Sequence, residues 1–372
     1  MDLKPIIGVV GLGTMGLGIA QVYAAAGFRV LATDGHAPAR ESAVGRLAGS
    51  LDARVAAGKL TTVLRDATLA GLEVVGTIAE LAPAALVIEA IVEDAAAKQS
   101  LFRSLEAVVA PDAVLASNTS SIPVATMAQM LTHPARVLGL HFFNPAPAMK
   151  LVELVGHAGT SLAALTLARQ ITEAAGKTVI ACPDRPGFIV NRCARPYYGE
   201  ALALLEQGGT ATQIDAAMLA AGYRLGPFGL IDLIGADINL AATNGLYQAM
   251  GHHPRYHPFD ALKVQVASGN LGRKTGRGFV FPDTVAALPN AAISTRIEAA
   301  LINEACYLAG EGVDPQGIDT AMRLGLNFPR GPFETLQNYG KVSILATLAA
   351  LEASAPPHLK TRYLPAPYLE AA

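Results

Sequence analysis

The sequence predicts a doubly wound parallel α/β domain at the N-terminus, followed by an all-α region that is present in two copies. Three observations support this prediction: a glycine-rich turn between a short apolar strand and a helix, strand and helix patterns that alternate after it, and an internal repeat in the C-terminal half. We expect domains at residues 1–182, 183–282 and 292–372, a linker at residues 282–292, and an extended proline-rich tail from Pro356.

Composition limits the classes of function. The chain has 372 residues, of which 52% are apolar and 16% are charged, so it is long and apolar enough to bury a core without disulfides. Its 28 Lys and Arg residues nearly balance 30 Asp and Glu residues, which argues against a nucleic-acid partner. Cys182, Cys193 and Cys306 are far apart and have no metal-binding spacing. We therefore expect no metal site, and reduced thiols in a cytoplasmic protein.

A run without charge at residues 5–28 is long enough to suggest a transmembrane helix or a secretory signal. Its six glycines make that helix unfavourable, because each costs about 1 kcal/mol relative to alanine. The run divides better into a buried strand at residues 6–10, a turn, and a helix at residues 14–26 closed by Gly27. A second strand follows at residues 29–33, and we expect no membrane association.

The turn has the sequence Gly11-Leu-Gly-Thr-Met-Gly16, a GxGxxG pattern between strand and helix. Gly11 permits the tight turn, Gly13 lets the backbone approach a pyrophosphate, and Gly16 allows close packing of the helix on the strand. The helix N-terminus attracts phosphates. Asp34, at the end of the second strand, can accept hydrogen bonds from ribose hydroxyls and would repel a 2′-phosphate. The pattern indicates a Rossmann-type NAD site.

Further buried strands are expected at residues 72–78, 85–90, 113–117 and 137–142, with a helix at residues 95–109 among the segments between them. Ligands of such sheets bind at the carboxyl ends of the strands. Four polar residues lie near the carboxyl ends of predicted strands and are therefore candidates for the site: Glu93, Asn118, Ser120 and His141.

Four motifs resemble those of the L-3-hydroxyacyl-coenzyme A dehydrogenases of fatty-acid β-oxidation, in order and spacing. They are SNTSS from Ser117, HFFNPAPAMKLVE from His141, PGFIVNR from Pro186 and GRKTGRGF from Gly272. The resemblance covers residues 5–281 and suggests a single-function bacterial type with a duplicated helical domain. It implies NAD-dependent oxidation of an (S)-3-hydroxyacyl-CoA to the 3-oxoacyl-CoA.

The resemblance assigns four catalytic positions. His141 is the general base for the hydroxyl proton, a role that suits an imidazole near neutral pH. Glu153 would orient the ring and stabilise the imidazolium, and Ser120 and Asn191 would hydrogen-bond the substrate oxygen.

The resemblance also implies contacts to the cofactor and to coenzyme A. The cofactor set is Gly11, Gly13, Thr14, Met15, Gly16, Asp34, Glu93, Lys98, Asn118 and Lys274. The substrate set is Ser120, Asn144, Ser50, Arg54 and Lys59, the last three in a helical excursion at residues 38–59. The family's lysine in that excursion falls at Ala57, which leaves the phosphate contact open. Glu93 and Lys98 are alternatively exposed charges at a helix start, and Lys274 a residue of a solvated turn.

The C-terminal half contains a repeat. The segment from Glu200 to Met218 and Gly226-Pro-Phe recurs from Glu304 to Met322 and Gly331-Pro-Phe, at an offset of 104 residues that becomes 105 at the glycine. Thr295 stands where the first copy has Asn191, so we expect the second copy to be structural. Single-copy members of the family dimerise through this domain. A second copy in the same chain could cover the same face and make a monomer possible, without excluding a homodimer.

Two other functions remain open. The chain could be a related NAD enzyme that acts on a sugar acid or another small hydroxy acid, or a non-catalytic NAD-binding protein of the same fold. The Phe-Phe-Asn-Pro motif from Phe142 and the helical excursion favour the thioester, and the four filled catalytic positions argue against a non-catalytic protein. Acyl chain length, a dicarboxylic acyl group and the physiological direction are not predicted.

Overall fold

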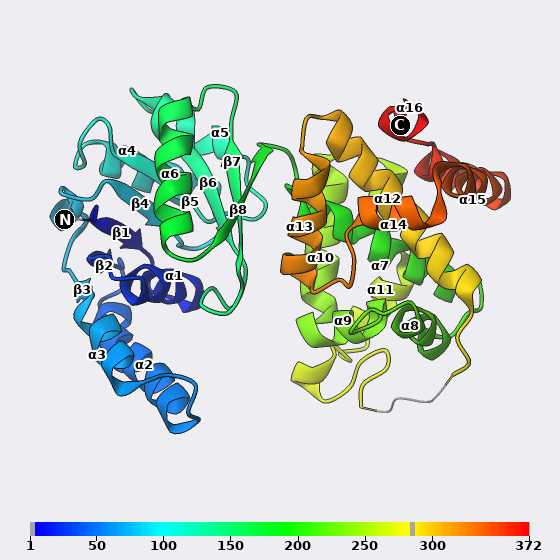
Figure 1. Cartoon of the computed structure of the whole chain (residues 1–372), viewed down its shortest axis with the longest axis horizontal. Helices are drawn as coiled ribbons and strands as arrows, with labels where there is room; N and C mark the ends of the chain where they lie inside the picture. Colours follow the sequence, from blue (N-terminus) through cyan, green and yellow to red (C-terminus); the bar gives the residue numbers. More distant parts are fainter. Residues whose placement is uncertain (1–3, 283–286, 372) are drawn as a thin grey trace. The chain divides into compact units, whose positions relative to one another are not determined.

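The computed structural model describes residues 4–282 and 287–371. It divides into two compact units, residues 1–185 and 186–372 (Figure 1). The first corresponds to the predicted α/β domain, and the second is helical and spans the residues in which two helical copies are predicted. The finer division into three domains stays a prediction, and part of the expected linker, residues 283–286, lies outside the described residues.

The first unit is built on an eight-stranded sheet with the order β3-β2-β1-β4-β5-β6-β7-β8. The strands are β1 (Ile7–Val10), β2 (Val30–Thr33), β3 (Leu72–Val74), β4 (Leu86–Glu89), β5 (Val114–Ser117), β6 (Val137–Phe142), β7 (Leu151–Gly156) and β8 (Thr178–Pro183). Neighbours are parallel except for β6 and β7, which are antiparallel. The expected strand at residues 72–78 is too long, because it ends at Val74 and Ile78 begins a 3-10 turn.

Six α-helices of the described residues accompany this sheet. They are α1 (Thr14–Ala25), α2 (Ala37–Ala56), α3 (Thr62–Ala70), α4 (Ala95–Glu106), α5 (Val124–Ala128) and α6 (Leu162–Ala174). The uncharged run at the N-terminus is apolar because it is buried: all four residues of β1 are buried, and α1 packs Ile19, Val22 and Tyr23 into the core of this unit. Within the described residues, no helix is long and apolar enough to cross a membrane.

The second unit is helical. Its first part contains α7 (Val190–Glu206), α8 (Ala211–Ala220), α9 (Pro227–Ile234), α10 (Ala236–Ala249), the short turn η3 (Pro254–Tyr256) and α11 (Asp260–Ala267). Its second part contains α12 (Ala291–Gly310), α13 (Pro315–Leu326), α14 (Pro332–Tyr339) and α15 (Lys341–Ser354). The long helices α7 and α12, the first of each part, pack against each other (Figure 1).

The expectation of an extended tail from Pro356 is wrong. Residues Pro357–Tyr363 form a 3-10 segment, η5, and Pro367–Ala371 form a last helix, α16. Tyr363 and Leu369 are buried in a cluster with Ile302 of α12 and Leu348 of α15. The prolines therefore punctuate a segment that the apolar side chains between them hold against the helices.

The Gly-Pro-Phe motifs of the repeat have the same local structure. Asp215 of α8 accepts hydrogen bonds from the backbone N–H groups of Phe228 and Gly229, at 2.9 and 2.8 Å, and so caps the start of α9. In the second part, Asp319 of α13 caps α14 in the same way. Its carboxylate accepts from Phe333 and Glu334 at 2.7 and 3.0 Å.

Each capping aspartate also explains the glycine before the proline. A Cβ at Gly226 would overlap the Asp215 side chain, and a Cβ at Gly331 would overlap Asp319. The glycine of each motif is therefore required by a close contact between a carboxylate and the turn that begins the next helix.

Candidate active site

The glycine-rich turn has the geometry expected of a dinucleotide loop. Gly11 has a left-handed φ of 101°, and a Cβ there would overlap the Ala90 carbonyl; a Cβ at Gly16 would overlap the Gly11 carbonyl. At Gly13, in contrast, a Cβ would meet no described atom within 4 Å. Gly13 is also the N-cap of α1 and provides no side-chain acceptor, so the N-cap residue leaves the first N–H groups of α1 without a side-chain cap. The turn can accept a pyrophosphate.

Asp34 lies directly after β2 and against this turn. Its Oδ2 accepts a hydrogen bond from the N–H of Leu12 at 2.7 Å, and its Oδ1 accepts from the N–H of His36 at 2.8 Å. Two arginines lie beside it: Arg40 donates to the Asp34 carbonyl, and Arg46 donates to the Leu12 carbonyl at 2.6 Å. The carboxylate thus occupies the place from which the second strand of such folds binds a ribose.

His141 and Glu153 form a buried pair at the end of the sheet. His141 on β6 is opposite Glu153 on the antiparallel strand β7, and its Nδ1 lies 2.6 Å from the Glu153 Oε2. His141 is 7% exposed and Glu153 is fully buried. Because a carboxylate accepts hydrogen bonds, the ring donates through Nδ1, and in the neutral imidazole Nε2 then carries the lone pair. This arrangement can transfer a proton at Nε2.

Neighbouring contacts fix the segment that contains His141. The Asn118 side-chain oxygen accepts from the N–H of Phe142 at 2.8 Å and ties the ends of β5 and β6 together. The Phe143 ring lies 4.6 Å from the His141 ring. Lys177, 9% exposed, donates to the carbonyls of Ala146 and Met149 in the connection between β6 and β7. Burial lowers the pKa of Lys177 to about 8. No sequence signal marked this lysine.

Glu93 organises the loop that contains Ser120. Its Oε1 accepts from the Thr119 hydroxyl at 2.6 Å, the Ser120 N–H at 3.2 Å and the Ser121 hydroxyl at 2.9 Å. Burial raises the pKa of Glu93, but the Thr119 hydrogen bond and the charge of Lys98 outweigh burial and leave the pKa lowered. The Ser120 side chain itself is exposed. Glu93 therefore shapes the end of β5, in addition to any contact with a cofactor.

Lys98 is not an exposed charge at a helix start, because its side chain is 1% exposed. Its Nζ lies 2.6 Å from Oε1 of the fully buried Glu89 and 3.1 Å from Oε2 of Glu93. Glu89 also accepts from the Ser117 hydroxyl at 2.7 Å. Sequence reasoning missed Glu89, although an acidic residue at the end of the apolar strand Leu86–Glu89 was a usable signal.

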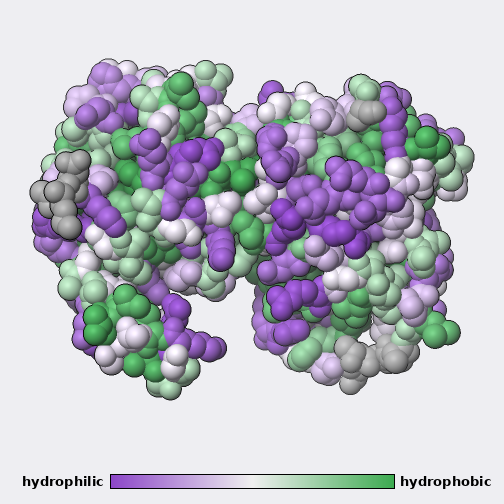
Figure 2. All heavy atoms as spheres, in the orientation of Figure 1, coloured by the Kyte–Doolittle hydropathy of each residue, from purple (hydrophilic) through white to green (hydrophobic). Residues whose placement is uncertain are grey.

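The other candidate residues lie elsewhere. Ser50 and Arg54 on α2 and Lys59 just after it are exposed, as is Asn144. Figure 2 shows an apolar patch over α2 and α3, where Val44, Val63 and Leu64 are exposed. In the second unit, Asn191 lies in the first turn of α7. Lys274 lies in the short turn η4 (Arg273–Thr275), where its Nζ is 2.5 Å from the Asp237 carboxylate.

The sheet order, the glycine turn with its facing aspartate and the buried imidazole–carboxylate pair define a dinucleotide-binding protein of the doubly wound α/β class. The chain belongs to the 3-hydroxyacyl-CoA dehydrogenase family. The model of that family's NAD binding domain matches residues 6–185, and the model of its C-terminal domain matches residues 187–281 and 293–371.

Individual proteins of this family are also similar to this chain. The chain is 43% identical over 274 residues to the 3-hydroxyadipyl-CoA dehydrogenase of Escherichia coli K12, an alignment that covers 73% of this chain and 58% of that protein. It is 42% identical over 277 residues to a 3-hydroxybutyryl-CoA dehydrogenase of Mycobacterium tuberculosis H37Rv, covering 73% and 96%. The crystal structure of the E. coli 3-hydroxybutyryl-CoA dehydrogenase superposes with a TM-score of 0.91 at 32% identity, over 100% of this chain and 98% of that one.

Proposed function

We propose that this protein catalyses the NAD-dependent oxidation of an (S)-3-hydroxyacyl-CoA to the 3-oxoacyl-CoA. The observation that carries the proposal is the pair formed by His141 and Glu153, 2.6 Å apart and buried on adjacent strands. Family membership supports the cofactor and the substrate class. The relatives' names, which include 3-hydroxyadipyl-CoA and 3-hydroxybutyryl-CoA dehydrogenases, leave the acyl group of this enzyme open.

In the proposed mechanism, Nε2 of His141 accepts the proton of the 3-hydroxyl group as hydride leaves C3. NAD supplies the hydride acceptor when it is bound. Glu153, hydrogen-bonded to Nδ1, holds the ring in the tautomer that presents Nε2 and stabilises the imidazolium that forms. Ser120 and Asn191 would hydrogen-bond the substrate oxygen. A positioned base of this kind contributes about 10²–10⁴-fold to the rate.

The residues of the first unit fit NAD. The open space at Gly13 and the N-terminus of α1 suit the pyrophosphate, and the Asp34 carboxylate suits the ribose hydroxyls. The other residues proposed to contact the cofactor are Thr14, Met15, Glu93, Lys98, Asn118 and Lys274. For coenzyme A, the exposed residues Ser50 and Arg54 on α2 and Lys59 just after it would contact the phosphates and adenine.

The test is a spectrophotometric assay of NADH oxidation with acetoacetyl-CoA, with free acetoacetate and sugar acids in parallel. We expect turnover with the thioester. Activity on free acids alone would select the hydroxy-acid dehydrogenase, and NADH binding without turnover of any of these compounds would select a non-catalytic protein. A series of acyl chain lengths and dicarboxylic thioesters would then define the acyl group.

We also propose that the helical region arose by duplication and that its two copies form a pseudo-dimer within one chain. Arg192 of α7 pairs with Glu304 of α12 at 2.6 Å, and Arg296 of α12 pairs with Glu200 of α7 at 2.8 Å. These residues occupy equivalent places in the two copies, so the contacts are reciprocal, as in a two-fold symmetric dimer.

The reciprocal pattern extends to a short Arg-Tyr sequence in each copy. Glu304 also accepts hydrogen bonds from Arg255 and Tyr256, at 2.9 and 2.6 Å. Glu200, in the same way, pairs with Arg362 and accepts from Tyr363 at 3.2 Å. We therefore propose a monomer in which the second copy covers the face that single-copy relatives would use to dimerise.

Light scattering after size exclusion tests this arrangement. The full chain should have the mass of a monomer, and a chain that ends at Phe281 should dimerise or aggregate because the α7 face is exposed. A full chain that dimerises, or a well-behaved monomeric truncation, would contradict it. Cys182 and Cys306 are buried and form no disulfide among the described residues, which supports the proposal that the protein is cytoplasmic.

A further inference from the structure

The turn that leads into α7 has an unusual backbone. Gly187 and Phe188 both have left-handed backbone conformations, with φ of 76° and 46°. Unlike Gly187, Phe188 has a bulky side chain, and that side chain is buried. A bulky residue keeps this conformation only where its surroundings enforce it, and such positions cluster at functional sites. The N–H of Arg192 donates to the Gly187 carbonyl at 3.0 Å and closes the turn. Asn191, proposed to bind the substrate oxygen, lies inside it.

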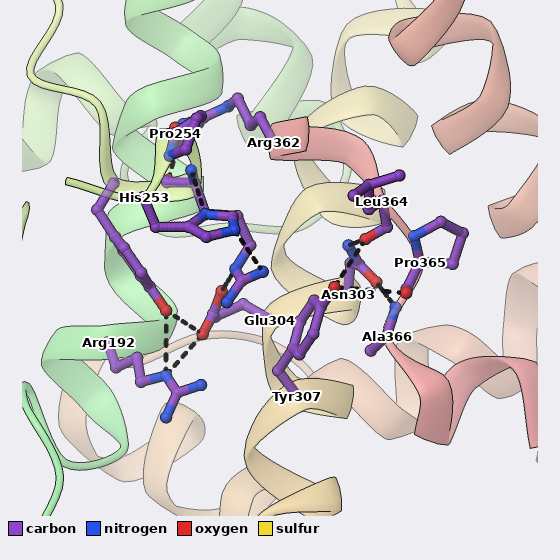
Figure 3. A network of polar contacts seen from close by, with 12 residues as sticks. Arg192, His253, Pro254, Asn303, Glu304, Tyr307, Arg362, Leu364, Pro365 and Ala366 are labelled. Atoms are coloured by element: carbon purple, nitrogen blue, oxygen red, sulfur yellow. Dashed lines mark hydrogen bonds and ion pairs between the residues drawn. The ribbon is translucent and has the colours of Figure 1, made fainter. Parts of the chain in front are cut away.

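The side chain of Arg192 is anchored by the second copy. It is 1% exposed, and its Nε lies 2.6 Å from Oε1 of Glu304. Its two terminal nitrogens each lie 2.8 Å from one oxygen of Glu311, which forms a bidentate pair. Glu304 lies on α12, and Glu311, two turns further along the chain, is the C-cap residue that follows this helix. Figure 3 shows Arg192 directed at Glu304. One arginine thus joins the start of α7 to α12 at three points.

The equivalent arginine of the second copy provides an internal comparison. Arg296 of α12 reaches Glu200 of α7 and Gln207, the C-cap residue that follows α7. These positions correspond to Glu304 and Glu311 of the other copy. Gln207 accepts a single hydrogen bond at 2.7 Å where Glu311 makes a charged bidentate pair. A bidentate pair between two opposite charges is stronger than one hydrogen bond from an arginine to a neutral amide. The stronger anchor therefore holds the helix that contains Asn191, and the weaker one holds the helix that contains Thr295.

We propose that Glu311 and Glu304 of the second copy act as positioning residues for the reaction, by fixing Arg192 and with it the turn that contains Asn191. Successive residues of a helix are rotated by about 100°, so anchoring Arg192 inside the helical unit sets the direction of Asn191. The second copy has no equivalent of Asn191, but it is then needed to orient Asn191 of the first copy correctly. This inference rests on the proposed function and on the role proposed for Asn191.

The experiment compares the full-length variant Glu311→Ala with Gln207→Ala, which removes the equivalent contact in the other copy. Glu311 is suited to this because its side chain is 34% exposed, whereas Glu304 is fully buried and its loss endangers folding. We expect Glu311→Ala to lower kcat with acetoacetyl-CoA by at least about fivefold, since small errors in the placement of a substrate-binding group are costly. KM for NADH should not change, Gln207→Ala should keep the kcat of the wild type, and Glu311→Gln should restore part of the activity.

Hydrogen exchange at residues 187–193 provides a readout that does not need activity. Exchange there should rise in Glu311→Ala and not in Gln207→Ala. Equal kcat values for Glu311→Ala and the wild type, or equal losses in Glu311→Ala and Gln207→Ala, would overturn the inference. If the wild type itself does not reduce the thioester, the proposed function fails, and the exchange measurement alone then decides whether the second copy fixes this turn.

Discussion

His141 and Glu153 face each other across the one antiparallel step of an otherwise parallel sheet. Directly opposed residues of antiparallel strands place their side chains on the same face, about 5 Å apart at Cβ, which is a suitable separation for the 2.6 Å hydrogen bond between them. Both ends of the pair are therefore held by backbone hydrogen bonds rather than by flexible loops. A site on strands keeps its geometry more accurately than one on loops.

The Asp34 carboxylate should control cofactor choice. We expect Asp34→Ala to raise KM for NADH by about tenfold or more, the effect of losing a charged hydrogen-bond acceptor. The preference for NADH over NADPH should narrow, because Arg40 and Arg46 lie beside Asp34 and remain. Steady-state kinetics with both cofactors measures this. Asp52→Ala, which removes an exposed carboxylate of α2, is the control. An unchanged preference would contradict the placement of the ribose.

The buried contact between Lys98 and Glu89 should matter far more to stability than a surface ion pair. Lys98→Met leaves the Glu89 carboxylate buried without its cation, and breaking such a pair costs about 3–5 kcal/mol. Arg29→Met breaks the ion pair between Arg29 and Glu73, two side chains that are each more than half exposed. This substitution should lower the free energy of unfolding by about 1 kcal/mol or less. Urea unfolding of both variants measures the difference. Similar losses would show that Lys98 is not held as described.

The capping carboxylate of Asp215 should make stability depend on pH. Burial raises its pKa from 3.8 to about 6, an effect that the N–H groups of Phe228 and Gly229 only partly offset. The folded state thus binds this proton more tightly than the unfolded chain. The protonated Asp215 carboxyl therefore contributes to the free energy of unfolding. This contribution is fully present below about pH 4 and is lost as the pH rises through about 6.

The free energy of unfolding of the wild type minus that of Asp215→Asn should therefore fall by about 2 kcal/mol between pH 4.5 and 7. Taking the difference cancels the carboxylates that titrate in both proteins. Urea unfolding at several pH values gives the result, and a difference that rises with pH would mean that the N–H groups dominate over burial.

The sequence was sufficient for the parts of the fold that depend on local pattern. The glycines within residues 5–28 separated a strand and a helix from a false membrane segment, and Asp34 followed from the spacing of the same motif. β7 was not predicted as a strand, because its six residues contain Glu153 within an apolar run. The antiparallel pairing that brings Glu153 to His141 depends on the whole sheet and has no local signal.

The burial of charged side chains was also not predicted from the sequence. Lys98 and Glu89 are uncharacteristic of a protein interior, and each is buried only because the other is there. The second Arg-Tyr sequence, Arg362-Tyr363, was missed for a different reason. It lies in the segment expected to be an extended tail, and its equivalence to Arg255-Tyr256 becomes visible only through the contacts with Glu200 and Glu304.

Rapid kinetics of NADH oxidation by acetoacetyl-CoA, in the wild type and in His141→Ala and Glu153→Gln, tests the central proposal most directly. We expect both variants to bind NADH as the wild type does and to turn over more slowly by about 10²–10⁴-fold. His157→Ala, which removes a histidine bonded to the Pro134 carbonyl, should retain full activity. Near-normal turnover in both His141→Ala and Glu153→Gln would contradict the assignment of the base.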